Sequence, residues 1–347
     1  MRFNHAASFF AAVLGAQLYS RKANKRLSDK LSLELDRRQA RDELPPREVD
    51  LQLLHNKFMR FRPRLIGAVG AYCLLSGQHH PDVVQNGGLD LFRTMWYLGA
   101  TQDDLIDEIP SQNGIERRHV ELRIRDAMFG TDRTIYRAAL RVFSDDLSRS
   151  DFPPEAQQYL RRKVRDWYRF LVEQEAKVLT MHSSELGYWE CRRYREEQNM
   201  RVAKLLTACL NGRRCHEPEM QVLETLVPML SFRTQIIDDV ADVFEDLAMG
   251  RPSFCMGALN DNPHELHNVR EFARKNPRVK KMQVQLFRKL APKSASLIES
   301  TYDQYGADLR TRSEPFVLLA TVGDMLYRWF PTFRDAIYRL QPRWANF

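Results

Sequence analysis

The sequence has few cysteines, glycines and prolines, and their scarcity excludes several classes of protein. Its five cysteines are odd in number and irregularly spaced, and no Cys-x-x-Cys pair occurs. This argues against a disulfide framework and a cysteine zinc site, and it favours a reducing compartment. The 15 glycines and 16 prolines are scattered without repeats, and with 44% hydrophobic residues the chain can bury a sizeable core.

The N-terminal region lacks acidic residues throughout residues 1–28. Residues 6–16 form an apolar run that is too short to span a bilayer comfortably. Four basic residues follow it: Arg21, Lys22, Lys25 and Arg26. Three interpretations stay open: an organelle-targeting segment, an interfacial helix in peripheral contact with a membrane, or a first helix packed on the body. We expect a cytoplasmic protein, with membrane association or organelle targeting as alternatives.

The rest of the chain is patterned as helix. Residues 29–50 are densely charged and end in Pro45-Pro46, which indicates a polar helix followed by a stop. From residue 51 onward, apolar residues recur at three- and four-residue spacing. We therefore predict an N-terminal extension over residues 1–50 and one all-α domain over residues 51–347.

The net charge of +8 suits a polyanionic partner, which could be nucleic acid, an anionic membrane or a phosphorylated small molecule. No helix-turn-helix, zinc or RNA-binding motif accompanies the charge. We expect no nucleic-acid partner.

Two acidic clusters share the pattern D-D-x-x-D and lie in mostly apolar, helical surroundings. They comprise Asp103, Asp104 and Asp107 in the first cluster, and Asp238, Asp239 and Asp242 in the second. On a helix, residues i and i+4 share a face, so each cluster directs two or three carboxylates toward one point. Buried like charges are costly unless a cation compensates them, and Mg²⁺ suits carboxylate ligands that leave room for water and phosphate.

One such motif alone is typical of a solvent-exposed helix face, because short motifs arise by chance. Two copies 135 residues apart, both in apolar helices, favour a metal site instead. We expect all six aspartates to take part in catalysis and two pairs of them to hold Mg²⁺, Asp103 with Asp107 and Asp238 with Asp242; Asp104 and Asp239 are further candidate ligands.

The second cluster and its flanks resemble the class I isoprenoid synthases, and among them the trans-polyprenyl diphosphate synthases. In that family Q-x-x-D-D-x-x-D-V is followed by a loop ending in Gly-Lys; here Gln235 opens the motif and Arg251 stands at the lysine position. The resemblance covers roughly residues 50–260. It implies one large helical bundle with a central cavity, a homodimer, and three Mg²⁺ ions bound with the substrate diphosphate.

A third match is the R-x-R-P segment formed by Arg60 and Arg62 before Pro63. The resemblance implies that these arginines bind the diphosphate of isopentenyl diphosphate, since guanidinium groups grip phosphate in bidentate fashion. The Gly-Gly-Lys that precedes this segment in the family is missing here.

Two further departures concern the same co-substrate. The Arg-Arg pair after the first cluster is displaced to Arg117 and Arg118, and the family's Lys-Thr pair has the wrong spacing at Lys204 and Thr207. We expect Lys204 and Arg251 to bind diphosphate and Gln235 to orient the second cluster or the substrate, with Arg117 and Arg118 as weaker candidates.

The activity that the resemblance implies is Mg-dependent transfer of an allylic prenyl group to isopentenyl diphosphate, giving a longer polyprenyl diphosphate. The altered co-substrate motifs leave two enzymatic alternatives open, a terpene cyclase and a head-to-head prenyl synthase. A third alternative is a non-catalytic regulatory subunit with the same fold.

Overall fold

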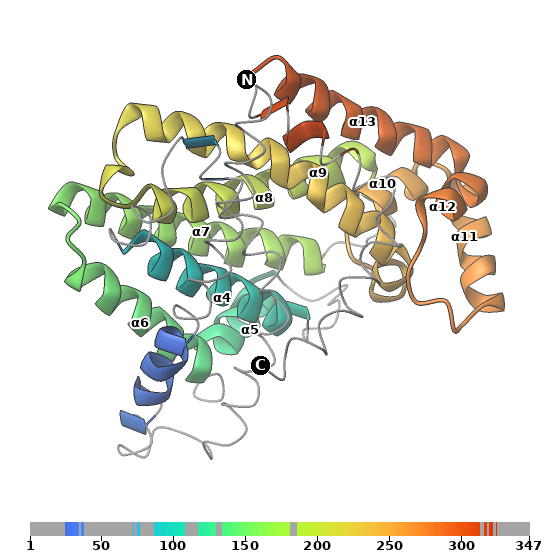
Figure 1. Cartoon of the computed structure of the whole chain (residues 1–347). Coiled ribbons are helices and arrows are strands. Elements are labelled where there is room, and N and C mark those ends of the chain that lie inside the picture. Colours follow the sequence, from blue (N-terminus) through green and yellow to red (C-terminus); the bar gives the residue numbers. More distant parts are fainter. Residues whose placement is uncertain are drawn as a thin grey trace. The chain divides into compact units, whose positions relative to one another are not determined.

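The computed structural model describes residues 25–34, 36–37, 72, 75–76, 87–107, 117–129, 134–180, 186–312, 316–317, 319–321 and 324. Of these residues 87% are helical and none lies in a strand, which confirms the prediction of an all-α fold (Figure 1). The expected boundary at residue 50 and the apolar run at residues 6–16 lie outside the described residues.

The helices follow one another with short connections. In chain order they are α4 (Gly88–Asp107), α5 (Arg117–Phe129), α6 (Thr134–Arg149), α7 (Pro154–Thr180), α8 (Tyr188–Asn211), the 3₁₀ turn η2 (Gly212–Arg214), α9 (Pro218–Met249), α10 (Phe254–Asn260), α11 (Pro263–Lys275), α12 (Val284–Leu290) and α13 (Pro292–Arg310).

Proline marks the start of four of these helices: Pro154 in α7, Pro218 in α9, Pro263 in α11 and Pro292 in α13. The first turn of a helix has unpaired N–H groups, so proline's missing donor costs nothing there and its fixed φ already suits the helix. Four of the 16 prolines of the sequence thus begin helices, whereas Pro228 lies inside α9.

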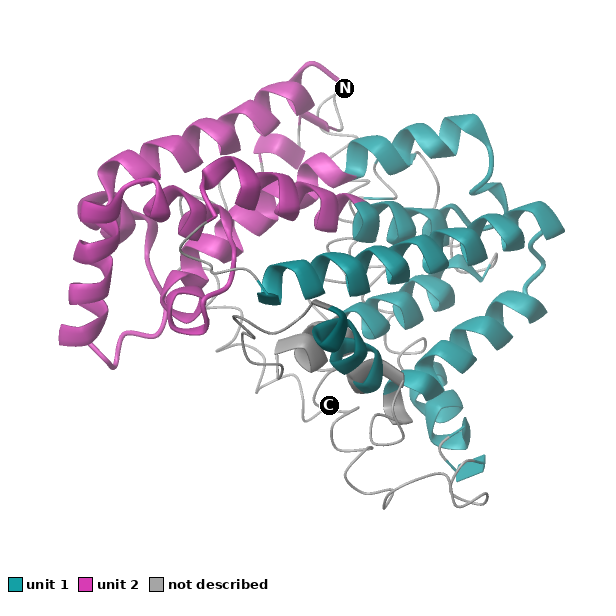
Figure 2. Ribbon diagram, turned by 180° about the vertical axis from the view of Figure 1, so that it is seen from behind, with its two compact units in different colours: residues 1–180, 201–227 teal, residues 181–200, 228–347 magenta. Residues whose placement is uncertain are grey.

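The chain separates into two compact units (Figure 2). Unit 1 comprises residues 1–180 and 201–227, and unit 2 comprises residues 181–200 and 228–347. Each unit buries its own apolar core. The first aspartate cluster belongs to unit 1 and the second to unit 2.

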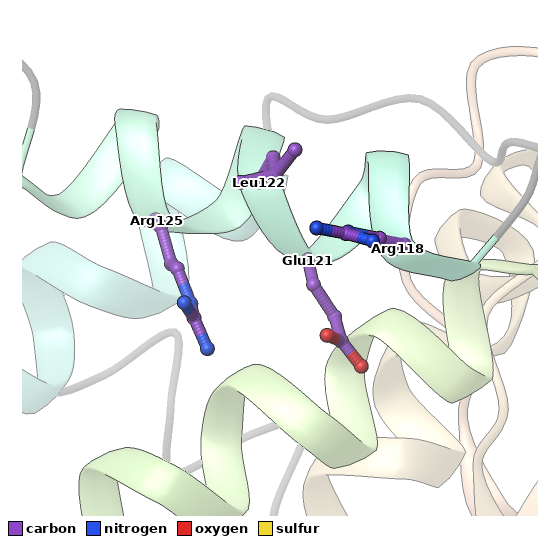
Figure 3. Close-up of a pocket in the computed structure, with 4 residues that line it drawn as sticks. All are labelled: Arg118, Glu121, Leu122 and Arg125. Carbon is purple, nitrogen blue, oxygen red and sulfur yellow. The ribbon is translucent and has the colours of Figure 1, made fainter.

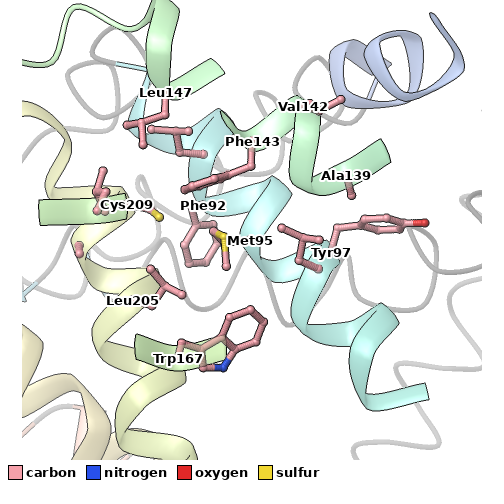
Figure 4. Close-up of a cluster of buried hydrophobic side chains, with 14 of the residues drawn as sticks. Phe92, Met95, Tyr97, Ala139, Val142, Phe143, Leu147, Trp167, Leu205 and Cys209 are labelled. Atoms are coloured by element: carbon pink, nitrogen blue, oxygen red, sulfur yellow. The ribbon is translucent and has the colours of Figure 1, made fainter. Parts of the chain in front are cut away.

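In unit 1, helix α4 packs against α6, and α5 packs against α7. Figure 4 shows Phe92, Met95 and Tyr97 of α4 among side chains of other helices of this unit, with Leu205 of α8 close by. Phe92 and Tyr97 are almost fully buried. Burying a side chain of this size stabilises the fold by roughly 2 kcal/mol, so this core holds α4 firmly in the unit.

In unit 2, helix α10 is buried along its length and packs against α11 and α13. Ser253 caps its N-terminus by accepting a 3.2 Å hydrogen bond from the backbone N–H of Met256. Gly257 lets the helix approach its neighbours closely, because a Cβ there would lie 2.8 Å from the Cα of Tyr188. The absence of a side chain at Gly257 is thus a packing requirement.

None of the helices in the described ranges combines the length and the apolar character needed to cross a membrane.

Candidate functional site

The first aspartate cluster occupies the last turns of α4, which ends at Asp107. Its three aspartates therefore lie on a helix, as the sequence pattern predicts, with Asp103 and Asp107 one turn apart. The side chains of residues 100–107 lie outside the described residues. Upstream, the side chains of Tyr97 and Leu98 are buried in the core of unit 1.

The second cluster lies in the middle of α9, and its three carboxylates do not share one environment. Asp239 is 2% exposed, whereas Asp238 and Asp242 are half-buried. On the helix, Asp238 and Asp242 are four residues apart and form one face, while Asp239 is turned toward the interior of unit 2. The cluster therefore divides into an outward pair and one buried carboxylate.

The buried carboxylate of Asp239 is fully engaged by protein groups. Its Oδ1 accepts a 2.6 Å hydrogen bond from Nε2 of Gln235, and its Oδ2 accepts a 2.8 Å bond from the backbone N–H of Phe254. The guanidinium of Arg195 on α8 lies 3.6 Å from Oδ1. Burial raises the pKa of Asp239, and the three partners counteract that effect by stabilising the charged form.

A second buried carboxylate, Asp246, lies seven residues further along α9. Burial and then the charge of Asp239 raise the pKa of Asp246 to about 7, while Arg195 and the hydroxyl of Ser253 oppose the rise. Its Oδ2 is buried without a hydrogen-bond partner among the described residues. Two carboxyl groups thus share the guanidinium of Arg195, and this arrangement favours a proton on Asp246.

Asp242, one member of the outward pair, has a different partner. The Nζ of Lys281, in the segment between α11 and α12, donates a hydrogen bond to Oδ1 of Asp242. The same Nζ lies 3.4 Å from Oε2 of Glu245, one turn further along α9. The ammonium group of Lys281 therefore lies on the same face of α9 on which the sequence predicts a metal ion.

The end of α9 positions Arg251. Gly250 has a φ of 67°, a left-handed conformation that favours glycine and ends the helix. The backbone N–H of Arg251 then donates a 2.9 Å hydrogen bond to the carbonyl oxygen of Asp246. The helix continues for almost two turns beyond Asp242, so the stretch from the aspartates to Gly250 is helical and not a loop.

Lys204, a predicted diphosphate ligand, lies in unit 1 beside a buried acid. Glu224 is 1% exposed, and its Oε2 accepts a 2.6 Å hydrogen bond from the hydroxyl of Tyr159. Lys163 lies 3.3 Å from the same oxygen. Burial and the charge of Lys163 lower the pKa of Lys204, and Glu224 counteracts them. Lys204 therefore belongs to a cluster of two lysines around one carboxylate.

Arg118 lines a pocket of about 490 Å³ on the surface of unit 1, together with Glu121, Leu122 and Arg125 (Figure 3). All four come from α5, which contacts α4, the helix that carries the first cluster. Two arginines suit an anion, although Glu121 between them reduces the local positive charge. The side chain of Arg117 lies outside the described residues, as do Arg60 and Arg62.

Among the described side chains, no group of three or more His, Cys, Asp or Glu residues is arranged to hold a metal ion. Mg²⁺ commonly takes only one or two protein carboxylates and completes its shell with water and substrate phosphate. The outward pair Asp238 and Asp242 fits that donor set, and the lysine against Asp242 supports its preference for a cation.

Comparison with known protein families, curated proteins and solved structures found no match to this chain. The resemblance to isoprenoid synthases thus rests on sequence motifs: the two aspartate clusters in their helical setting, and the R-x-R-P segment at Arg60 and Arg62.

Three residues of this region were not predicted as site residues. They are Arg195, Asp246 and Lys281. Asp246 carries a sequence signal, because it follows Asp239 by seven residues and so lies on the same helix face. Arg195 and Lys281 carry none, since only the fold brings them to α9.

Proposed function

We propose that this chain is a Mg-dependent prenyltransferase with the isoprenoid synthase type of bundle and central cavity. It would ionise an allylic prenyl diphosphate and join it to isopentenyl diphosphate, giving a longer polyprenyl diphosphate. The observation that carries the proposal is the division of the second cluster. The buried Asp239 is anchored by Arg195, Gln235 and the Phe254 N–H, which leaves Asp238 and Asp242 as an oriented pair one helical turn apart.

Each group has a role in this proposal. Asp238 and Asp242 would hold Mg²⁺ from α9, and Asp103 and Asp107 would do so from α4. When bound, Mg²⁺ supplies Lewis-acid activation and neutralises the charge that develops on the leaving diphosphate.

The protein's own cations and apolar surface complete the proposed chemistry. Arg251, at the end of α9, would bind the diphosphate directly through its guanidinium. Apolar side chains of the helices would keep water from the prenyl cation. In the same proposal the enzyme would be a cytoplasmic homodimer, with membrane contact through its N-terminal segment or organelle targeting by residues 1–28 as alternatives.

The test is a turnover assay on the full chain with farnesyl and geranylgeranyl diphosphates, with and without labelled isopentenyl diphosphate. Products are identified by mass spectrometry in MgCl₂ and in EDTA. We expect longer prenyl diphosphates only when Mg²⁺ and isopentenyl diphosphate are both present. Asp238→Asn should abolish the product, whereas Asp308→Asn, which alters an exposed carboxylate on α13, should leave it unchanged.

Other outcomes replace the proposal with one of its alternatives. Hydrocarbon or alcohol formed without isopentenyl diphosphate would indicate a cyclase or a head-to-head synthase. No turnover with any substrate would contradict an enzymatic role and favour a regulatory subunit.

A further inference from the structure

The segment between α11 and α12, residues 276–283, is basic and lies against the aspartate face of α9. It contains Arg278, Lys280 and Lys281 and no acidic residue. Lys281 is the residue that reaches the cluster, since its Nζ contacts both Asp242 and Glu245. The segment therefore brings positive charge to the carboxylates that we propose as metal ligands.

One contact within this segment, and one near the end of the preceding helix α11, hold it at α9. The backbone N–H of Met282 donates a 3.0 Å hydrogen bond to the carbonyl oxygen of Ala241, the residue before Asp242, and the Met282 side chain is buried. Phe272 of α11 stacks on Phe244 of α9, with ring centroids 6.0 Å apart and an interplanar angle of 11°. The backbone beside Lys281 is thus fixed, and only its flexible side chain is free to change position.

The ion pair itself is open to solvent. The side chain of Lys281 is 41% exposed and that of Asp242 is 31% exposed. Exposed pairs of this kind are weak, so a divalent ion at Asp242 would displace the ammonium group easily. Because Met282 anchors the backbone, the displaced ammonium stays within a side chain's length of the ion and of any phosphate that the ion carries.

We infer that Lys281 exchanges partners during binding: its ammonium neutralises Asp242 when no metal is present and binds the substrate diphosphate when Mg²⁺ is bound. This inference rests on the proposed function and adds a diphosphate-binding residue to it. Lysine is suited to the exchange because its compact charge and flexible stem accept either a carboxylate or a phosphate.

The exchange predicts two effects of opposite sign, measured by isothermal titration calorimetry on the full chain. Lys281→Met removes the competing cation, so MgCl₂ alone should bind about fivefold more tightly, given the weakness of an exposed pair. The same change removes a phosphate ligand, so inorganic pyrophosphate at saturating MgCl₂ should bind about tenfold more weakly. If Lys281 only stabilised the fold, its substitution would not strengthen Mg²⁺ binding and weaken pyrophosphate binding at the same time.

Matched variants complete the experiment. Lys280→Met alters the exposed neighbouring lysine and should change both affinities less than about twofold. Lys281→Arg keeps the charge and should retain pyrophosphate binding. Lys281→Gln, which removes the charge and keeps a polar side chain, should reproduce both shifts if the methionine variant folds poorly.

The outcomes separate the inference from the proposed function. If the wild-type chain binds Mg²⁺ and pyrophosphate and Lys281→Met changes neither affinity, or moves both in one direction, the exchange is refuted and the metal site stands. If the wild-type chain binds neither, both the metal site and the role of Lys281 are refuted.

Discussion

The carboxylate of Asp239 accepts a 2.8 Å hydrogen bond from the backbone N–H of Phe254, and this bond joins the aspartate helix α9 to the first residue of α10. Phe254 itself is fully buried, so the bond lies inside the core of unit 2. One carboxylate of the D-D-x-x-D motif, that of Asp239, thus stabilises the folded structure of unit 2. Its neighbours Asp238 and Asp242 are thereby fixed on the adjacent, half-buried face of the helix.

Asp239→Ala should destabilise the chain strongly. The substitution leaves the buried N–H of Phe254 without its acceptor and removes the carboxylate beside the guanidinium of Arg195, which costs about 2 kcal/mol of unfolding free energy. Urea denaturation followed by circular dichroism measures the change. Asp308→Ala, at an exposed position on α13, is the matched control and should change stability by less than about 0.5 kcal/mol. Equal stability of the two variants would contradict the anchoring role of Asp239.

Asp238→Ala and Asp242→Ala should have little effect on stability and a large effect on activity, unlike Asp239→Ala. Both side chains are half-buried, so each substitution should lower stability by less than about 1 kcal/mol. Each should also lower Mg-dependent release of pyrophosphate from an allylic diphosphate by about 100-fold or more, because a metal ligand is lost. A colorimetric pyrophosphate assay and a thermal melt of the same samples give both quantities. Retained turnover in both variants would show that the pair does not hold a catalytic metal.

Asp246 should make stability depend on pH. Burial and the charge of Asp239 raise the pKa of Asp246 to about 7 in the folded chain, and an unfolded aspartate titrates near pH ~3.9. Between these two pH values the folded state therefore binds more protons than the unfolded state. The stabilisation contributed by protonated Asp246 is fully present below about pH 4 and is lost as the pH rises through about 7.

Asp246→Asn removes this titration. The variant should gain about 3 kcal/mol over the wild type at pH 7.5, and the gain should shrink toward pH 4. Urea midpoints across this pH range measure the difference. A gain that does not vary with pH would show that Asp246 is already ionised in the folded chain at low pH.

Gly257→Ala should destabilise unit 2. The new Cβ would lie 2.8 Å from both the Cβ of Cys191 and the Cα of Tyr188, and the latter is backbone that cannot yield without moving α8. Overpacking of this kind costs about 2 kcal/mol, which should appear as a lower melting temperature. Gly99→Ala in α4 is the matched control, because a Cβ added there would have nothing within 4 Å and alanine favours helix by roughly 0.5 to 1 kcal/mol. An unchanged melting temperature for Gly257→Ala would show that α8 and α10 are not in close contact.

The helical character of both aspartate clusters could be predicted from the sequence. Their apolar neighbours recur at helical spacing, and that periodicity is a local property of the chain. The same periodicity places Asp238 and Asp242 on one face of α9. The sequence could not show that Asp239 is anchored, because its acceptor role depends on Phe254 and on Arg195, which come from other segments.

The sequence by itself thus determined an all-helical chain with two D-D-x-x-D motifs, each on a helix, since neighbouring residues decide helix formation and side-chain spacing. Only the tertiary structure decided the charge partners of these aspartates. Arg195 lies 44 residues before Asp239 and Lys281 lies 39 residues after Asp242, so no local pattern links either pair. Packing of α8, α10 and the segment before α12 against α9 brings them together, because burying the apolar faces of these elements fixes where their charges lie.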